Sequence, residues 1–345
     1  MRIDWDVERI LDRAQAGEDL TRDDALGLMG VDLDSPEMYL LWAVADRMTR
    51  QHCDNSGDVF AQIGLDYDRC PERCQFCMFG TGEIPDAKRV LLGLDDVVER
   101  AVRSEQEGAN AVYLMTTASY DFRRFLQIGR AVRVALSPEM PLVANIGDFS
   151  PRQARELQEA GFCAVYHAVR VREGRDSRIP VARRLASIRH AQEAGLAVHF
   201  CVEPVGPEHR AEELVNLMFL GRELGVAWSG AMRRVNVPGS PLKKHGELPW
   251  RELARVVAVC RLVMGRACHA HCTHEPNLPA LLAGANILWA EVGPNPRDPT
   301  AETEASRGIS VSDCRAMLVD AGYRPRQGPS PNVWPPEREL AHVWA

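Results

Sequence analysis

Long apolar runs are missing from this sequence of 345 residues. The longest, such as residues 281–290, fall well short of the roughly 20 residues that a membrane-spanning helix needs. The N-terminal stretch carries acidic residues where a signal peptide has its basic segment, and no apolar core follows it. We therefore expect a cytoplasmic protein with no membrane partner.

Long runs of one charge sign are also missing. The 48 acidic residues and 41 lysines and arginines give a formal net charge of −7 and are spread along the chain. A nucleic-acid partner is disfavoured, because proteins that bind nucleic acids gather basic residues on one face. Ten cysteines are present, but a chain without an export signal is not expected to use them as a disulfide framework.

Short apolar or β-branched runs alternate with amphipathic helical patterns from about residue 58, which is typical of a parallel α/β sheet. Two of the predicted helices, 151–160 and 181–194, end at Gly161 and Gly195, where glycine suits the C-cap. Strands are predicted at 59–65, 111–116, 142–146, 164–169, 197–203, 227–235, 267–273 and 287–292. These units predict an α/β fold with a (β/α)8 TIM-type barrel, whose functional residues gather at the carboxyl ends of the strands.

The barrel is predicted to span residues 56–323. Residues 1–55 form an N-terminal helical extension, with one helix at 20–28 and another that begins at Ser35 and Pro36, an N-cap followed by proline at the first helical position. Residues 324–345 form a proline-rich C-terminal tail, expected to wrap the surface or an oligomer contact. The oligomeric state itself is not predicted.

A cysteine triplet, Cys70, Cys74 and Cys77, follows the first predicted strand with the spacing C-x3-C-x2-C. Three thiolates this close on one loop suit three irons of a [4Fe–4S] cubane, since iron–sulfur clusters are held by thiolates. The fourth iron then lacks a cysteine and can bind an amine and a carboxylate. The alternatives are a zinc site, which usually takes four ligands, and a disulfide, which leaves one of the three cysteines over.

The triplet spacing, the aromatic Phe76 before the last cysteine and the position after the first strand resemble the radical S-adenosylmethionine (SAM) superfamily. The resemblance implies that SAM binds the open iron and that the reduced cluster splits SAM into a 5′-deoxyadenosyl radical. That radical takes a hydrogen atom from a small organic substrate. The resemblance also implies an electron donor such as flavodoxin or ferredoxin.

Within that superfamily, residues 58–323 look most similar to the group with biotin synthase, the FeFe-hydrogenase maturase and methylornithine synthase. Ordered local matches carry this resemblance, namely 145–150, 168–174, 203–208, 237–242 and 284–286. It implies that Arg184 meets the SAM carboxylate, for which a guanidinium fork is well suited, while its neighbour Arg183 faces outward. The cofactor-binding residues implied in this way are Phe76, Thr116, Thr117, Asn145, Arg170, Glu173 and Arg184.

Two departures from the group's pattern bear on the reaction. Thr116 and Thr117 stand where many relatives have a glycine-rich acidic turn for the SAM amine, so hydroxyls or backbone must serve there. Leu114, Val143 and Ala144 stand in the region where biotin synthase has cysteines for a second cluster. Sulfuration of dethiobiotin by that route is therefore not expected.

The seventh predicted strand is rich in cysteine and histidine. Side-chain alternation would put Cys268, Cys272 and His274 on one face of it. They either bind a second metal centre, or the cysteines are small core residues and His274 contacts the substrate; we favour the second interpretation. Glu203, near the mouth of the fifth strand, joins His274 and the triplet as a catalytic candidate.

The sequence thus predicts a radical SAM enzyme that rearranges or fragments a small substrate in cofactor or metabolite biosynthesis. One alternative is an enzyme that transfers sulfur or methyl groups with a second metal site. Another is a non-catalytic iron–sulfur or zinc protein, which added SAM would distinguish by leaving the spectrum of the reduced cluster unchanged.

Overall fold

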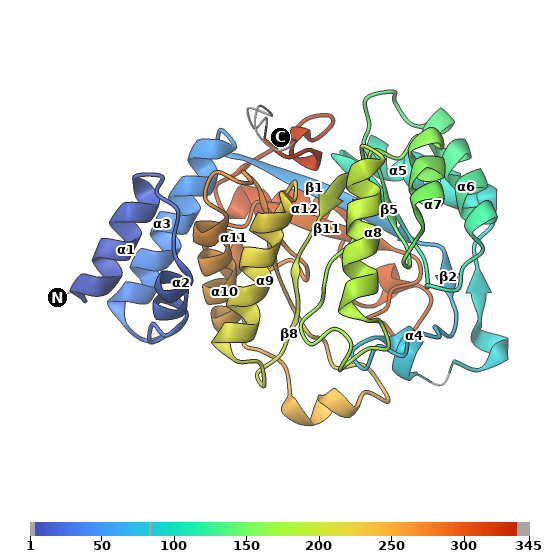
Figure 1. Ribbon diagram of the computed structural model, residues 1–345. Helices are drawn as coiled ribbons and strands as arrows, with labels where there is room; N and C mark the ends of the chain where they lie inside the picture. Colours follow the sequence, from blue (N-terminus) through green and yellow to red (C-terminus); the bar gives the residue numbers. More distant parts are fainter. Residues whose placement is uncertain (1–3, 83, 337–345) are drawn as a thin grey trace.

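The computed structural model describes residues 4–82 and 84–336, in which a curled parallel sheet is covered by helices (Figure 1). Its neighbouring strands follow the order β7-β6-β5-β4-β1-β11-β10-β9-β8. In the register, Phe60 of β1 pairs with Ala111 of β4 on one side and Trp289 of β11 on the other. The strands are β1 (Ser56–Gly64), β4 (Ala111–Met115), β5 (Leu142–Asn145), β6 (Ala164–Tyr166), β7 (Ala197–His199), β8 (Val202–Val205), β9 (Ser229–Arg233), β10 (His271–Thr273) and β11 (Ile287–Val292).

The sheet closes on itself through β7 and β8, which are consecutive parts of one extended segment. A parallel bridge joins His199 to Trp228, and the amide of Ala227 donates to the carbonyl of Val198 at 2.9 Å. The fifth predicted strand is therefore present but interrupted between these two parts. The predicted α/β class and TIM-type barrel are confirmed.

Helices surround the barrel, and local sequence signals set their ends. Ser150 caps α7, with its hydroxyl accepting from the amide of Gln153, and Pro151 takes the first helical position. Gly195, with φ at +79°, follows α8 in the left-handed region that glycine adopts without strain. The helices are α5 (Leu94–Gln106), α6 (Phe122–Ala135), α7 (Pro151–Glu159), α8 (Val181–Glu193), α9 (Ala211–Leu224), α10 (Trp250–Met264), α11 (Leu278–Leu281) and α12 (Val311–Asp320).

Large aromatic rings fill the interior of the barrel. Phe60, Tyr113, Trp228 and Trp289 are all buried there, and the Tyr113 and Trp289 ring centroids lie 4.5 Å apart. A second apolar layer separates the sheet from the helices. The lower barrel is thus a packed core rather than a pore, as in other TIM barrels.

Three N-terminal helices pack beside the barrel: α1 (Trp5–Gln15), α2 (Arg22–Met29) and α3 (Pro36–His52). Helix α2 lies against α9 and α10, α3 lies against α10, and α1 packs on α2 and α3, at the left of Figure 1. Ser35 has the extended N-cap conformation and Pro36 the first helical position, as predicted. Within the described part of the chain, no helix is both long and apolar enough to cross a membrane.

The C-terminal segment closes the amino end of the barrel. Its strand β12 (Arg324–Pro325) pairs with the start of β1. The buried carboxylate of Asp58 accepts hydrogen bonds from Arg326 Nε at 2.5 Å, Ser330 Oγ at 2.5 Å and Asn332 Nδ2 at 2.7 Å. Residues 324–336 thus lie against the barrel, while residues 337–345 of the predicted tail fall outside the described residues. The predicted domain limits stay a prediction.

Candidate active site

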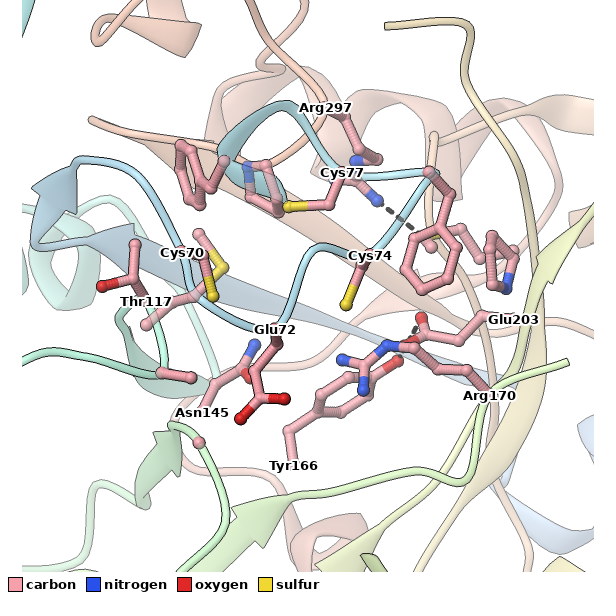
Figure 2. A pocket seen from close by; sticks show the side chains of 18 of the residues that line it. Cys70, Glu72, Cys74, Cys77, Thr117, Asn145, Tyr166, Arg170, Glu203 and Arg297 are labelled. Atoms are coloured by element: carbon pink, nitrogen blue, oxygen red, sulfur yellow. Dashed lines mark hydrogen bonds and ion pairs between the residues drawn. The ribbon is translucent and has the colours of Figure 1, made fainter. Parts of the chain in front are cut away.

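The cysteine triplet lies on the loop between β2 (Asp66–Tyr67) and α4 (Met78–Thr81), at the carboxyl edge of the barrel. Figure 2 shows Cys70, Cys74 and Cys77 around one cavity, with their sulfurs directed toward it. All three belong to a single short loop, so their relative placement depends on how that loop folds back.

Close backbone contacts hold this loop in shape. The amide of Cys70 donates to the carbonyl of Phe79 at 2.8 Å, and the amide of Met78 donates to Pro296 at 2.7 Å. A Cβ at Gly80 would lie 2.6 Å from backbone atoms of Cys74. This contact is too short for any residue with a side chain. Gly80 therefore permits the return of the loop that brings the thiols together.

Burial raises the pKa of all three thiols. The pKa of Cys77 reaches about 12, because burial disfavours its thiolate and the neighbouring Cys70 adds to this effect. For Cys70 and Cys74 burial is again the main cause. The loop alone therefore holds neutral thiols, and a bound metal must displace their protons.

The thiols open into a cavity at the carboxyl ends of the strands. Of the twelve side chains predicted as site residues, all but Glu173 line this cavity, and Glu173 is buried behind Arg170 and Arg184. The predicted lining residues are Cys70, Phe76, Cys74, Cys77, Thr116, Thr117, Asn145, Arg170, Arg184, Glu203 and His274. The structure thus brings them to one place, while their individual roles stay predictions.

A charged group on β6, β8 and the following loops forms one wall. The Tyr166 hydroxyl donates to Glu203 Oε2 at 2.6 Å, and Arg170 Nε lies 3.5 Å from Glu203 Oε1. Arg170 also approaches Glu173 at 3.9 Å. Burial lowers the pKa of Arg170, but these carboxylates outweigh that effect and raise the pKa above its usual value, so Arg170 stays charged inside the protein. Figure 2 shows Tyr166, Arg170 and Glu203 side by side below the thiols.

Arg184 lies in a second buried group. Its NH1 is 3.3 Å from Asp148 Oδ1 and contacts the His167 ring, and its Nε is 3.7 Å from Glu173. Among the described residues, Nε has no hydrogen-bond acceptor. Burial and the charge of Arg170 lower the pKa of Arg184, while the nearby carboxylates of Asp148 and Glu173 oppose that shift.

Arg183 differs from the prediction that it faces outward without a role. Its side chain is 43% exposed, but its NH2 pairs with Glu72 at 2.7 Å and its Nε with Asp148 at 2.9 Å. Glu72 belongs to the cysteine loop. Arg183 therefore connects that loop to the buried group around Arg184, because its guanidinium spans both acids.

The turn after β4 uses its hydroxyls internally. Thr117 donates to Asp66 through its amide at 2.8 Å and through its hydroxyl at 2.5 Å, while the Thr116 hydroxyl donates to the Thr117 carbonyl at 3.0 Å. Burial raises the pKa of Asp66 to about 6. Both hydroxyl hydrogens are committed in this way, so towards a ligand amine the hydroxyl and carbonyl oxygens of this turn can act only as acceptors.

A polar network that the sequence did not predict crosses the barrel mouth. Asn145 Nδ2 donates to Gln62 Oε1 at 3.0 Å, and Gln62 Nε2 donates to Glu291 at 3.4 Å. Glu291 pairs with Arg297, whose NH1 donates to His274 Nδ1 at 3.1 Å. Gln62 and Glu291 are polar positions near the carboxyl ends of apolar strands, a signal that could have identified them; Arg297 lies in a loop and carried no such signal.

The comparisons with known proteins agree with this geometry. A family model described as "Radical SAM superfamily" matches residues 65–220. A biotin synthase from Desulforudis audaxviator is 30% identical over 268 residues, which cover 75% of this chain and 80% of that protein. The chain belongs to the radical SAM superfamily. Another relative, biotin synthase 2 from Corynebacterium diphtheriae, is 24% identical over 325 residues and covers 89% of this chain and 92% of its own.

Solved structures show the same radical SAM fold. Methylornithine synthase superposes with a TM-score of 0.77 at 17% identity, covering 92% of this chain and 97% of its own. The FeFe-hydrogenase maturase from Carboxydothermus hydrogenoformans superposes with a TM-score of 0.74 at 16% identity, covering 93% and 79%. At these identities the likeness concerns the fold alone.

The premise for a second metal centre in this radical SAM barrel is wrong. Strand β10 begins only at His271, because the carbonyl of Cys268 accepts from Arg261 NH1 at 3.2 Å and leaves the strand ladder. Cys268 therefore packs with the outer layer, whereas Cys272 lies in the barrel interior, 3.7 Å from the sulfur of Cys201. The face that Cys268, Cys272 and His274 were predicted to share does not form.

Proposed function

We propose that this radical SAM enzyme abstracts a hydrogen atom from a small organic substrate, in a rearrangement or fragmentation that belongs to cofactor or metabolite biosynthesis. One observation carries the proposal: a single cavity joins three cysteine thiols to a wall of oriented hydrogen-bonding groups. When bound, a [4Fe–4S] cluster and SAM supply the one-electron cleavage that yields a 5′-deoxyadenosyl radical.

The residues of the cavity fit these two groups. The triplet loop presents three soft sulfur donors, the set that an iron–sulfur cluster requires. The Nε–H of Arg184 is buried and has no acceptor among the residues that the structure describes, and such a group is costly unless a ligand completes it. We assign the SAM carboxylate to Arg184, which Asp148 and Glu173 hold in position, with Arg170 close by. The SAM amine would donate to oxygen acceptors of the turn at Thr116 and Thr117.

His274 is assigned to the substrate, on the basis of where its proton must lie. Arg297 NH1 can only donate, so His274 Nδ1 accepts and is unprotonated. Burial and the charge of Arg297 hold the pKa of His274 well below its usual value, so the ring is neutral with its proton on Nε2. Among the described residues Nε2 has no partner. It would donate a hydrogen bond to an acceptor atom of the substrate.

Glu203 is assigned a positioning role. Its two oxygens are engaged by the Tyr166 hydroxyl and by Arg170, so it orients both side chains at the cavity wall. A radical reaction requires that water and reactive side chains stay away from the reacting carbon. The packed aromatic interior beneath Tyr166 provides that exclusion from below, because Trp228 and Trp289 close the barrel there.

The function is tested with protein reconstituted anaerobically with iron and sulfide, SAM and a chemical reductant. Metabolite extract from cells grown in heavy water is then added, and 5′-deoxyadenosine is analysed by mass spectrometry. Deuterium in 5′-deoxyadenosine is expected, and fractionation of the extract identifies its source. Cluster-loaded protein that does not cleave SAM would refute the proposal.

The role of His274 is tested in the same assay. His274→Phe should abolish the substrate-dependent rate but leave slow uncoupled SAM cleavage, whereas His274→Gln, which retains an N–H donor, should keep part of the coupled rate. Loss of both activities in both variants would show that the residue is needed for structure instead.

A further inference from the structure

Two other loops are bonded directly to the outer side of the cysteine loop. The amide of Arg178 donates to the Glu72 carbonyl at 2.9 Å, and the amide of Gln75 donates to the Asp176 carbonyl at 2.8 Å. The Ser240 hydroxyl donates to the Gln75 carbonyl at 2.6 Å. Segments 72–75, 175–178 and 240–244 therefore form one surface directly outside the thiols.

This surface carries more cations than acids. The exposed basic side chains, which we call the basic face, are Arg73, Arg175, Arg178, Lys243 and Lys244. Within residues 4–82 and 84–336, none of them forms a side-chain hydrogen bond or ion pair. Both lysines belong to the turn η2 (Pro241–His245), which lies with α4 along the lower edge of the molecule in Figure 1.

The three segments contain two acids. Glu72 pairs with Arg183 at 2.7 Å, and Asp176 is buried near Arg172 and Arg175. Glu247, which follows η2, lies 3.5 Å from Arg233. The basic face therefore has a local excess of positive charge on a chain whose formal net charge is −7.

We propose that the basic face is the docking surface for an acidic one-electron donor protein, a reduced flavodoxin or ferredoxin. The inference rests on the proposed function. The donor loses one electron and the oxidised [4Fe–4S] cluster gains it, so no bond is made or broken. Opposite charges steer such encounters and orient the partner, and here they would seat the donor over Cys74, which is only partly buried beneath Arg73 and the neighbouring loops.

The test compares two triple charge reversals in the cluster-loaded protein. The first is Arg175→Glu, Lys243→Glu and Lys244→Glu on the basic face. The matched control, Arg130→Glu, Arg155→Glu and Arg189→Glu, makes the same change in net charge on exposed positions of α6, α7 and α8. Binding of oxidised flavodoxin and of ferredoxin is measured by calorimetry without SAM, and cluster reduction by the reduced donor is measured by stopped-flow absorbance, each at low and high salt.

Reversal on the basic face should weaken binding and slow reduction by about tenfold or more at low salt, and the difference should shrink as salt screens the charges. The control should behave like the wild type. Dithionite should reduce all three proteins at similar rates. Equal donor binding and reduction in all three proteins would overturn the proposal, as would equal slowing with dithionite, which would mean a general effect on anions. A failure of the proposed function is separate, because dithionite-driven SAM cleavage by the wild type would then be missing.

Discussion

Replacement of Arg184 by glutamine should reduce SAM affinity. Arg184 is 3% exposed and is held in place by Asp148, His167 and Glu173, and its Nε lacks an acceptor among the described residues. A hydrogen bond to a charged group is worth about 1.5–3 kcal/mol, which corresponds to a dissociation constant raised about 10- to 150-fold. Arg184→Lys should recover only part of that loss, since an ammonium cannot form the two-point contact of a guanidinium.

The assay is equilibrium dialysis of SAM against oxidised, cluster-loaded protein. The variant must first be shown to be folded, because removing one partner from a buried ion pair costs about 3–5 kcal/mol of stability. Arg189→Gln is the control on the same helix, since Arg183 contacts both Glu72 and Asp148 and is not neutral. Unchanged SAM affinity in a folded, cluster-loaded Arg184→Gln protein would refute the assignment.

The remaining predictions concern the cluster, the closing segment and the pH dependence of stability. The wild type should bind about four irons and four sulfides, and alanine at each of the three triplet cysteines should remove them. Iron and sulfide are measured after anaerobic reconstitution. Tightly bound zinc without iron would contradict this prediction. Asp58→Ala should lower the free energy of unfolding by about 1–3 kcal/mol, because it leaves the donors of Arg326, Ser330 and Asn332 without their shared acceptor. Urea denaturation should show a variant no less stable than wild type only if the closing segment contributes nothing. The Arg172 guanidinium lowers the pKa of Glu213 from 4.5 to about 2, so the pair stabilises the fold above about pH 4.5 and loses this effect as the pH falls toward 2. The stability gap between wild type and Glu213→Gln in urea denaturation should therefore close over that range, and a gap independent of pH would exclude the linkage.

The strands could be predicted because each combines a short apolar run with turn residues on either side. Such runs, alternating with amphipathic helices, are typical of buried parallel strands. The triplet was equally clear, since its three cysteines are adjacent in sequence and need no tertiary information. Side-chain alternation failed at Cys268, because a buried arginine on α10, Arg261, takes its carbonyl out of the ladder. Arg261 lies on a helix close in sequence to this strand, but the residue pattern of the strand gives no indication of the contact.

Partners within the cavity were harder to predict than the cavity itself. Asp148 and His167 lie in or next to strands that the sequence predicts. Their contact with Arg184, however, forms only when β5, β6 and α8 pack together. Arg297 reaches His274 from a loop after the last barrel strand. Such pairs depend on which side chains meet across the barrel mouth, and neither local propensity nor periodicity contains that information.

The charges of the cavity wall show how the site selects its ligands. Arg170 is opposed by Glu203, Arg184 by Asp148, and Arg297 by Glu291, so each buried cation already has a carboxylate beside it. The wall therefore exerts little net field, and a ligand is not attracted by charge alone. What the wall still offers is a set of donors without acceptors among the described residues, including Arg184 Nε and His274 Nε2. Because buried unpartnered donors are costly, the ligands that bind must place acceptor atoms at those fixed points, and a substrate so held presents one particular carbon to the radical.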